Sequence, residues 1–318
     1  MSSDTLVKLA LETLGCSQKE LAKKLGVSPS QISKWKATEY MSIEMSNRLK
    51  EIVNIVGYEP DFIYWVGGIE QAGQWEKLIK EIAQYALLSC ETGYVTDFLE
   101  TDDQLLRGML CCHTISILRD LGMTIPQVFP EELLLDDSYF NHEKQNHLYD
   151  LIRDGYEAFN NVYGFFYAHI APIVFEFEIS DDPAHLDGVE IGYLGRQMES
   201  ELLDLAFSMV AEESILTPNV RSFQHKTNTT FVEYITKIKQ YAFHKSIPLK
   251  AELSDLLSGD TESLRESAEI SSMGLTLDQL HPDIYMNEII HNLRFMRQVL
   301  PSICKKLGIT DLELKEQK

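Results

Sequence analysis

Two helix starts follow each other closely near the beginning of the chain, and their spacing restricts how the helices that they open can pack. Residues 17–20 read Ser-Gln-Lys-Glu, which is the pattern of a capping box. Residues 28–31 read Ser-Pro-Ser-Gln and predict a second capping box, with Pro29 at the first helical position, where its missing N–H is not needed. Gly26 ends the first helix in the left-handed conformation that glycine favours. The chain must therefore turn sharply between two short helices.

The first 57 residues predict a domain of four to five short helices. An apolar stripe at helical spacing precedes Gly15, and Ser42 begins a further helix after the closely spaced pair. The helix that begins at Pro29 leaves a polar outer face at residues 30–36. The side chains that we expect to be buried are Leu6, Leu9, Ala10, Leu14, Leu21, Ala22, Leu25, Ile32, Trp35, Met45, Leu49, Ile52 and Val53.

Residues 17–35 closely resemble the helix-turn-helix of the Cro and lambda-repressor family. The two helix starts, the apolar core positions and the glycine turn all fall in register over about 55 residues. The positions that carry the resemblance are Ser17, Gln18, Leu21, Ala22, Leu25, Gly26, Val27, Ser28, Ser30, Gln31, Ile32, Ser33 and Trp35. The resemblance implies that the helix beginning at Pro29 enters the major groove of DNA while the preceding helix braces the phosphate backbone.

The resemblance assigns roles to individual side chains. It implies that Pro29, Ser30, Ser33 and Lys34 face the bases; Gln31 joins them because glutamine can form two hydrogen bonds with adenine, and lysine can donate to guanine. Gln18 and Ser28 are expected at phosphates, near helix amino termini. The family usually has glutamate after the tryptophan and a glycine soon after. Here Lys36 and Thr38 stand there, which makes Lys36 an additional phosphate contact.

The charge of the chain is unevenly distributed. The chain has 28 basic and 49 acidic side chains, a formal charge of −21, which by itself argues against nucleic acid as a partner. Residues 17–50, however, hold seven basic and three acidic side chains, so this segment is +4 and the rest is about −25. A basic segment on an acidic body is typical of a small DNA-reading module joined to a second domain. An alternative is that the helix pair only packs or binds protein.

The composition indicates a folded cytoplasmic protein. Hydrophobic residues make up 44% and charged residues 24% of 318 residues, and no apolar run is long enough for a membrane span. The first residues lack the pattern of a secretory signal, so we expect no membrane association. Five cysteines without a C-x-x-C pair are typical of reduced thiols that pack in a core.

The remainder predicts a larger helical domain behind a short connection. Residues 58–75 are interpreted as a hinge that docks through its apolar side chains, and residues 76–318 as a helical dimerisation and sensing domain. Apolar and acidic residues alternate at 173–179, and apolar residues alternate again at 189–193, so we expect a β-hairpin at about 173–194. The predicted fold class is therefore mainly α with one hairpin.

No residue set predicts catalysis, a metal site or a cofactor. His142 and His147 are five residues apart, so on a helix they would not share the face that a zinc site needs. The carboxylates of Glu176 and Glu178 lack the lysine that often accompanies them in nucleases. The sequence thus predicts a protein that is not an enzyme.

We interpret the chain as a sequence-specific transcriptional regulator of the repressor type. It is expected to bind an inverted-repeat operator in double-stranded DNA as a homodimer, because one such module reads only a few base pairs. A small molecule, peptide or protein effector would act on the carboxy-terminal body. The alternative is a toxin–antitoxin or phage-defence effector whose body acts, or binds a partner, and whose amino-terminal domain targets DNA.

Overall fold

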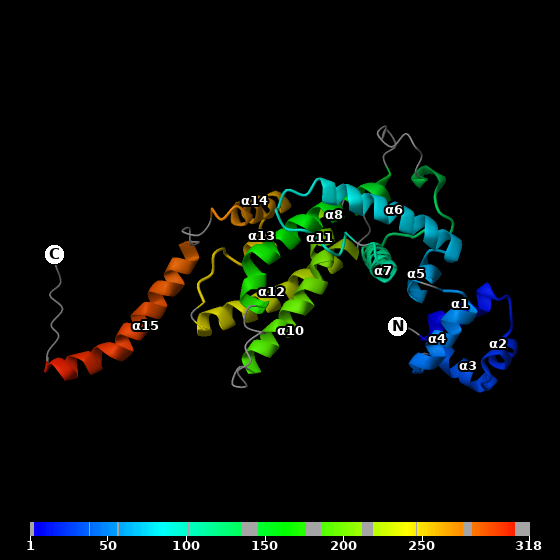
Figure 1. The fold of residues 1–318 in the computed structure, drawn as a ribbon, viewed down its shortest axis with the longest axis horizontal. Coiled ribbons are helices and arrows are strands. Elements are labelled where there is room, and N and C mark those ends of the chain that lie inside the picture. The colour runs from blue at the N-terminus through cyan, green and yellow to red at the C-terminus, as the bar shows by residue number, and fades with distance from the viewer. Residues whose placement is uncertain are drawn as a thin grey trace.

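The computed structural model describes residues 3–37, 39–55, 57–100, 102–134, 146–175, 186–211, 219–245, 247–275 and 282–308. Within these ranges every regular element is helical, and the helices form an elongated chain of packed elements (Figure 1). The amino-terminal helices lie at one end, and the last helix, α15 (Pro282–Leu307), extends at the other (Figure 1). The mainly α fold class is confirmed.

The amino-terminal domain contains the helices that the sequence predicts. They are α1 (Ser3–Thr13), α2 (Gln18–Leu25), α3 (Pro29–Lys36) and α4 (Ile43–Ile52). α1 packs against α3 and α4, and α2 packs against α3. Their shared core is fully buried at Leu6, Leu21, Leu25, Ile32 and Leu49. Burial of these side chains is the main force that fixes α3 on the rest of the domain.

Residues 58–75 are built into the packed structure through two helices. They contain α5 (Pro60–Trp65) and the first residues of α6 (Ile69–Leu88). α5 packs against α1 on one side and against α6 and α7 (Gln104–Asp120) on the other, and Phe62 and Ile63 are fully buried. One hydrophobic core therefore continues from the amino-terminal domain into the body.

The body is organised around α8 (His147–Phe165), which packs against α6, α11 (Leu202–Val210) and α14 (Thr261–Ser272). The Tyr156 hydroxyl on α8 forms a buried hydrogen bond of 2.6 Å with the Thr114 hydroxyl. The other elements of the body after α7 are η1 (Glu131–Leu133), η2 (Phe166–Ile170, a π-helix), α9 (Ala171–Phe175), α10 (Leu186–Ser200), α11 (Leu202–Val210), α12 (Asn219–Lys245), α13 (Asp255–Ser258), α14 (Thr261–Ser272) and α15 (Pro282–Leu307).

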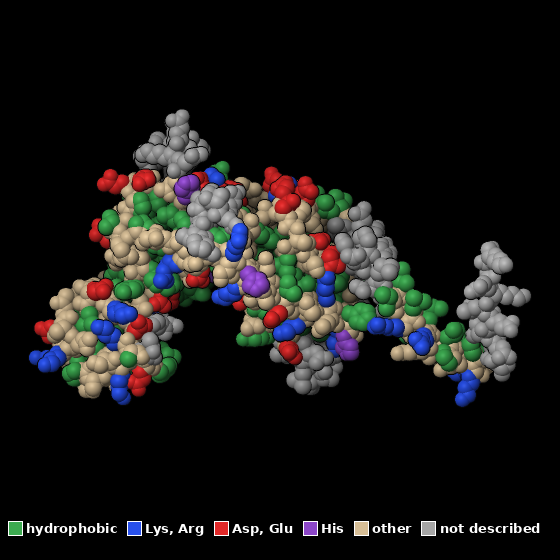
Figure 2. Space-filling model, turned by 180° about the vertical axis from the view of Figure 1, so that it is seen from behind, with side chains coloured by type: hydrophobic (Ala, Val, Ile, Leu, Met, Phe, Trp, Pro, Cys, Tyr) green, Lys and Arg blue, Asp and Glu red, His purple; other side chains and the backbone are tan. Residues whose placement is uncertain are grey.

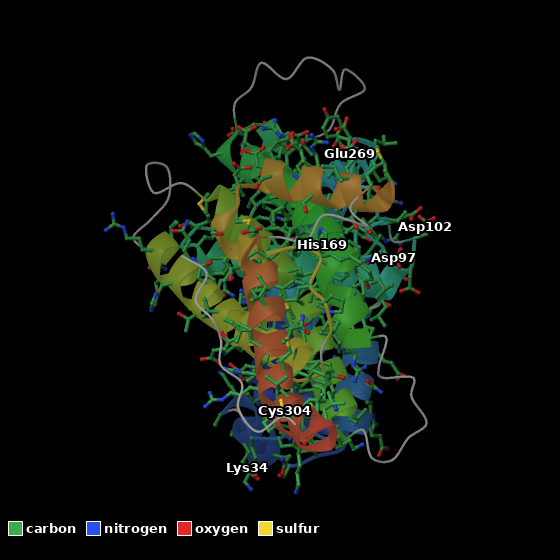
Figure 3. All side chains as sticks on the ribbon, turned by 90° about the vertical axis from the view of Figure 1, so that its left-hand side faces the viewer. Lys34, Asp97, Asp102, His169, Glu269 and Cys304 are labelled. Atoms are coloured by element: carbon green, nitrogen blue, oxygen red, sulfur yellow. The ribbon has the colours of Figure 1, made fainter. Side chains whose placement is uncertain are left out.

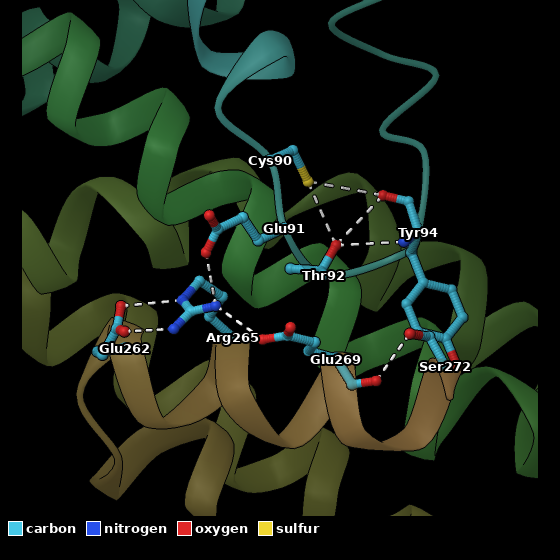
Figure 4. A network of polar contacts seen from close by, with 8 residues as sticks. All are labelled: Cys90, Glu91, Thr92, Tyr94, Glu262, Arg265, Glu269 and Ser272. Carbon is cyan, nitrogen blue, oxygen red and sulfur yellow. Dashed lines mark hydrogen bonds and ion pairs between the residues drawn. The ribbon is translucent and has the colours of Figure 1, made fainter. Parts of the chain in front are cut away.

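A polar network attaches α14 to the loop that follows α6 (Figure 4). The Arg265 guanidinium donates to Glu262 on its own helix at 2.6 Å and to Glu269 and Glu91 at 2.8 Å each. Within the loop, the Thr92 hydroxyl donates to a backbone carbonyl at 3.3 Å. The three carboxylates raise the pKa of Arg265, chiefly through the hydrogen bond with Glu262. The guanidinium thus joins two segments that are far apart in the sequence.

The predicted β-hairpin at about 173–194 is wrong. Residues 173–175 belong to α9 and residues 186–194 belong to α10, whereas residues 176–185, with Glu176 and Glu178, lie outside the described residues. Ile173 and Val174 are both buried although they are neighbours, which alternation on a strand would not produce. α9 packs against α10, and this tertiary packing outweighs the short alternating pattern.

Among the described residues, no helix combines the length and apolar character that crossing a membrane requires.

Candidate nucleic-acid interface

The turn between α2 and α3 is formed by the local signals that the sequence contains. The Ser17 hydroxyl accepts from the Glu20 N–H at 3.4 Å while the Ser17 N–H donates to the Glu20 carboxylate at 2.8 Å, so the capping box at α2 is complete. The Ser17 N–H and the Ser17 hydroxyl, which each donate to the Glu20 carboxylate at 2.8 Å, lower the pKa of Glu20. Gly26 has φ 73° and ends α2 in the left-handed conformation, as predicted. The sequence therefore determines this turn locally.

The start of α3 follows the prediction only in part. The Ser28 hydroxyl accepts from the Gln31 N–H at 3.2 Å and Pro29 is at the first helical position. The second half of the predicted capping box is not formed, because the Gln31 side chain does not return to the Ser28 backbone. The Ser28 hydroxyl is instead 2.8 Å from the Ser30 hydroxyl, and both are exposed.

The outer face of α3 presents a continuous polar strip. Ile32 and Trp35 are buried on the inner face. Positions 30, 33 and 34 point the opposite way, since residues three and four apart share a helix face, and all three side chains are exposed. Pro29, Ser28 and Lys36 are also exposed, whereas Gln31 and Gln18 are half-buried. The eight predicted contact residues thus lie on α3 and at the amino termini of α2 and α3.

Two of these residues contact each other across the helix pair. The Ser33 hydroxyl on α3 is 3.3 Å from Gln18 Oε1 on α2 and 3.2 Å from the Pro29 carbonyl. The bond holds the amino terminus of α2 beside the middle of α3. A side chain expected at a phosphate is thereby placed next to one expected at the bases.

Lys34 has an ion-pair partner that sequence reasoning missed. Its Nζ lies 3.7 Å from Glu39 Oε1, and the two side chains are 60% and 49% exposed. An exposed pair at this distance contributes little to stability, so it can open when a stronger acceptor arrives. A guanine edge or a phosphate can therefore replace Glu39 at Lys34. Figure 3 labels Lys34 on the amino-terminal domain.

Tyr40 is a second residue that sequence reasoning missed. It follows α3 in the chain and is 79% exposed, which is unusual for a large aromatic side chain. A ring in this position can contact a sugar or a phosphate beside the groove. The signal in the sequence is weak, because an aromatic residue in a short connection is more often part of a core.

The body holds two histidines with defined partners. His113 Nε2 is 2.8 Å from Asp204 Oδ2, which joins α7 to α11. His169, in η2, has Nε2 3.0 Å from the Ser267 hydroxyl and a buried Nδ1 without a hydrogen-bond partner. Desolvation lowers the pKa of His169 to about 4. Its place among the packed helices of the body can be followed in Figure 3.

No group of metal-binding side chains occurs in the part of the chain that the structure describes. His147 begins α8, and His142 lies outside the described residues.

α2, the tight turn and α3 with its exposed polar strip have the arrangement of a helix-turn-helix. Residues 7–38 match the family model described as helix-turn-helix, which confirms the resemblance to the Cro and lambda-repressor type for this segment. The match indicates a DNA-binding regulator and leaves the body outside it. No curated protein and no solved structure matches the chain.

Proposed function

We propose that this protein is a sequence-specific transcriptional repressor that binds an inverted-repeat operator as a homodimer. The observation that carries the proposal is the exposed strip of Ser30, Ser33 and Lys34 on α3, in the segment that matches the helix-turn-helix family. Lys34 and Gln31 supply donors and acceptors of the kinds that distinguish bases in the major groove. Gln18, Ser28 and Lys36 supply phosphate contacts that set the orientation of α3.

The homodimer follows from the size of the reading surface. The eight residues of α3 reach only a few base pairs, which occur too often in a genome to specify one site. Two copies related by a two-fold axis read two half-sites about 34–36 Å apart. Bound there, the pair would block access of polymerase to a promoter, which is the simplest route to repression. We assign the body no chemical step.

An open cavity at the junction with the body supports an effector role. Its volume is about 890 Å³, and it is lined by residues of α1, of α5 and the α5–α6 connection, and of the end of α7 and the segment that follows it. Across it, the Arg119 guanidinium lies 4.2 Å from the centre of the Trp65 ring, and Gln127 Nε2 donates to the Trp65 carbonyl at 2.9 Å. A ligand in this cavity would contact both the amino-terminal domain and the body, and it would change the position of α1 relative to the body.

A cavity-filling substitution tests this effector role without a known ligand. Thr124 lines the cavity and is exposed, so Thr124→Trp should mimic occupancy and change the Kd for the selected DNA by about fivefold or more. Thr229→Trp, on the exposed surface of α12, is the matched control. Equal Kd values for the two variants would contradict the effector role of this cavity.

The DNA part of the proposal is tested by selecting duplexes from a random library with the purified full chain. We expect enrichment of an inverted repeat whose half-sites are about one helical turn, or a multiple of it, apart. The Gln31→Ala, Lys34→Ala double variant should lose the enrichment. Lys237→Ala, which removes a lysine from the exposed face of α12, should retain it.

Two outcomes would overturn the proposal. No enrichment by a folded wild-type protein would shift the function to the body. Divalent-dependent cleavage of DNA by the purified protein, lost in a metal-free buffer, would make the protein an effector enzyme.

A further inference from the structure

The last helix of the described chain exposes an apolar strip. α15 (Pro282–Leu307) extends away from the body, at the end opposite to the helix-turn-helix (Figure 1). Six large hydrophobic side chains along it are between 41% and 68% exposed: Ile289, Leu293, Met296, Leu300, Ile303 and Leu307. Figure 2 shows hydrophobic side chains alternating with Lys and Arg along this extension. Monomeric proteins seldom leave such a strip uncovered.

The spacing of the strip identifies the kind of surface that covers it. Leu293, Leu300 and Leu307 recur every seven residues, and so do Ile289, Met296 and Ile303. Steps of four and three residues alternate over the whole strip. This is the a and d pattern of a coiled coil, in which the covering surface is another helix with the same repeat. We call these six residues the α15 seam.

The rest of α15 is compatible with such pairing. Arg294 points at the body, with its guanidinium 5.6 Å from the centre of the Phe243 ring of α12. Pro301 falls at an outer position of the repeat, so its ring does not enter the seam. Residues 289–308 contain two arginines and two lysines and no acidic residue. Arg294 and Lys305 are at outer positions, whereas Arg297 and Lys306 are beside the seam, where like charges on paired helices weaken association at low salt.

We propose that the α15 seam is a self-association surface whose partner is the same seam of a second copy of this chain. When two copies pair in register, each leucine of the seam meets the same leucine of the other copy, and each isoleucine or methionine likewise meets its equivalent. Burying six such side chains on each of two helices removes on the order of 1,000 Å² from water, which reaches the area of a specific interface. The α15 seam thus provides a contact surface for the homodimer of the proposed function. The inference rests on that function only because the function requires two copies.

The test is the mass of the full chain in solution without DNA, measured by sedimentation equilibrium. The wild type should give a multiple of 36.4 kDa. Leu293→Glu places a charge in the seam and should weaken association at least about tenfold. Phe295→Glu is the matched control, because both side chains are 58% exposed on the same helix and only Leu293 is in the seam. Ile303→Glu repeats the test further along, and circular dichroism verifies that each variant is folded.

The possible results test the α15 seam independently of DNA binding. Association that is lost in Leu293→Glu and Ile303→Glu and kept in Phe295→Glu supports the proposal. A monomeric wild type overturns it, and so does a monomer that binds anionic phospholipid vesicles through α15. Equal weakening by Phe295→Glu also overturns it. Because DNA is absent, none of these results bears on α3, whose role the duplex selection decides separately.

Discussion

The Ser33 hydroxyl on α3 lies 3.3 Å from Gln18 Oε1 on α2, and this bond connects the two halves of the helix-turn-helix on its outer surface. In free protein it holds Gln18 beside the reading face. On DNA the Gln18 Nε2 group, which this bond does not use, can donate to a phosphate oxygen. The same two side chains can therefore orient α3 before binding and contact DNA after it.

Because Glu39 pairs with Lys34, we expect the Glu39 carboxylate to weaken DNA binding by competing with DNA for the Lys34 ammonium group. Glu39→Gln leaves Lys34 free for a base or phosphate, so the Kd for the selected duplex should fall roughly two- to tenfold at low salt. The gain should shrink at high salt. Fluorescence anisotropy across a salt series measures it. Glu51→Gln, which removes an exposed acid from α4, controls for net charge, and an equal gain in both variants would refute a specific role for Glu39.

Lys36 is expected to contact a phosphate rather than a base. Lys36→Ala should then weaken binding to selected and scrambled duplexes by the same factor. The slope of log K against log salt should fall in magnitude by about one, because one fewer counterion is released. The same anisotropy series gives both slopes. A loss confined to the selected duplex would instead make Lys36 a base-reading residue.

His169 predicts a pH dependence of stability. Burial lowers its folded-state pKa from 6.5 to about 4, so between these values the unfolded chain binds a proton that the folded chain does not. Stability therefore falls as the pH drops through this window, by on the order of 3 kcal/mol. Urea unfolding at several pH values should show a flatter dependence in His169→Gln. The exposed His225→Gln should behave like wild type, and a wild-type profile in His169→Gln would contradict the assignment.

Two helical glycines predict opposite effects of the same substitution. A Cβ on Gly108 of α7 would lie 2.0 Å from the Gly57 carbonyl oxygen, so Gly108→Ala should destabilise the protein by about 1–3 kcal/mol. A Cβ on Gly73 of α6 would have the Tyr58 hydroxyl as its nearest atom, at 4.0 Å. Gly73→Ala should therefore stabilise by up to about 1 kcal/mol. Urea midpoints that shift in the same direction would contradict this packing.

The helix-turn-helix could be predicted because its signals are local. The capping box at Ser17 and the left-handed Gly26 each act within a few residues, and the buried Ile32 and Trp35 follow from helical spacing. The partner of Lys34 could not be predicted in the same way. Glu39 comes close to Lys34 only through the path of the chain after α3.

In the body, the local sequence pattern predicted the buried helix faces less well. α7 is apolar on several faces: Leu105, Leu106 and Met109 are exposed, whereas Leu110, Ile117 and Leu118 are buried. Periodicity cannot choose a face when most of a helix is hydrophobic. In α10, Ile191, Leu194 and Met198 are buried at helical spacing, and Tyr193, which the hairpin prediction placed with Ile191, is exposed. Packing against α9 and α12 selects that face.

The most direct measurement of the central claim is the specificity of binding. The Kd of the full chain is measured for the selected duplex and for a scrambled duplex of equal composition, at one salt concentration, for wild type and Lys34→Ala. We predict a wild-type ratio of about 10³ or more, and a loss of about 1–3 kcal/mol in Lys34→Ala on the selected duplex alone. A wild-type ratio close to one, or an equal loss on both duplexes, would contradict base reading by α3.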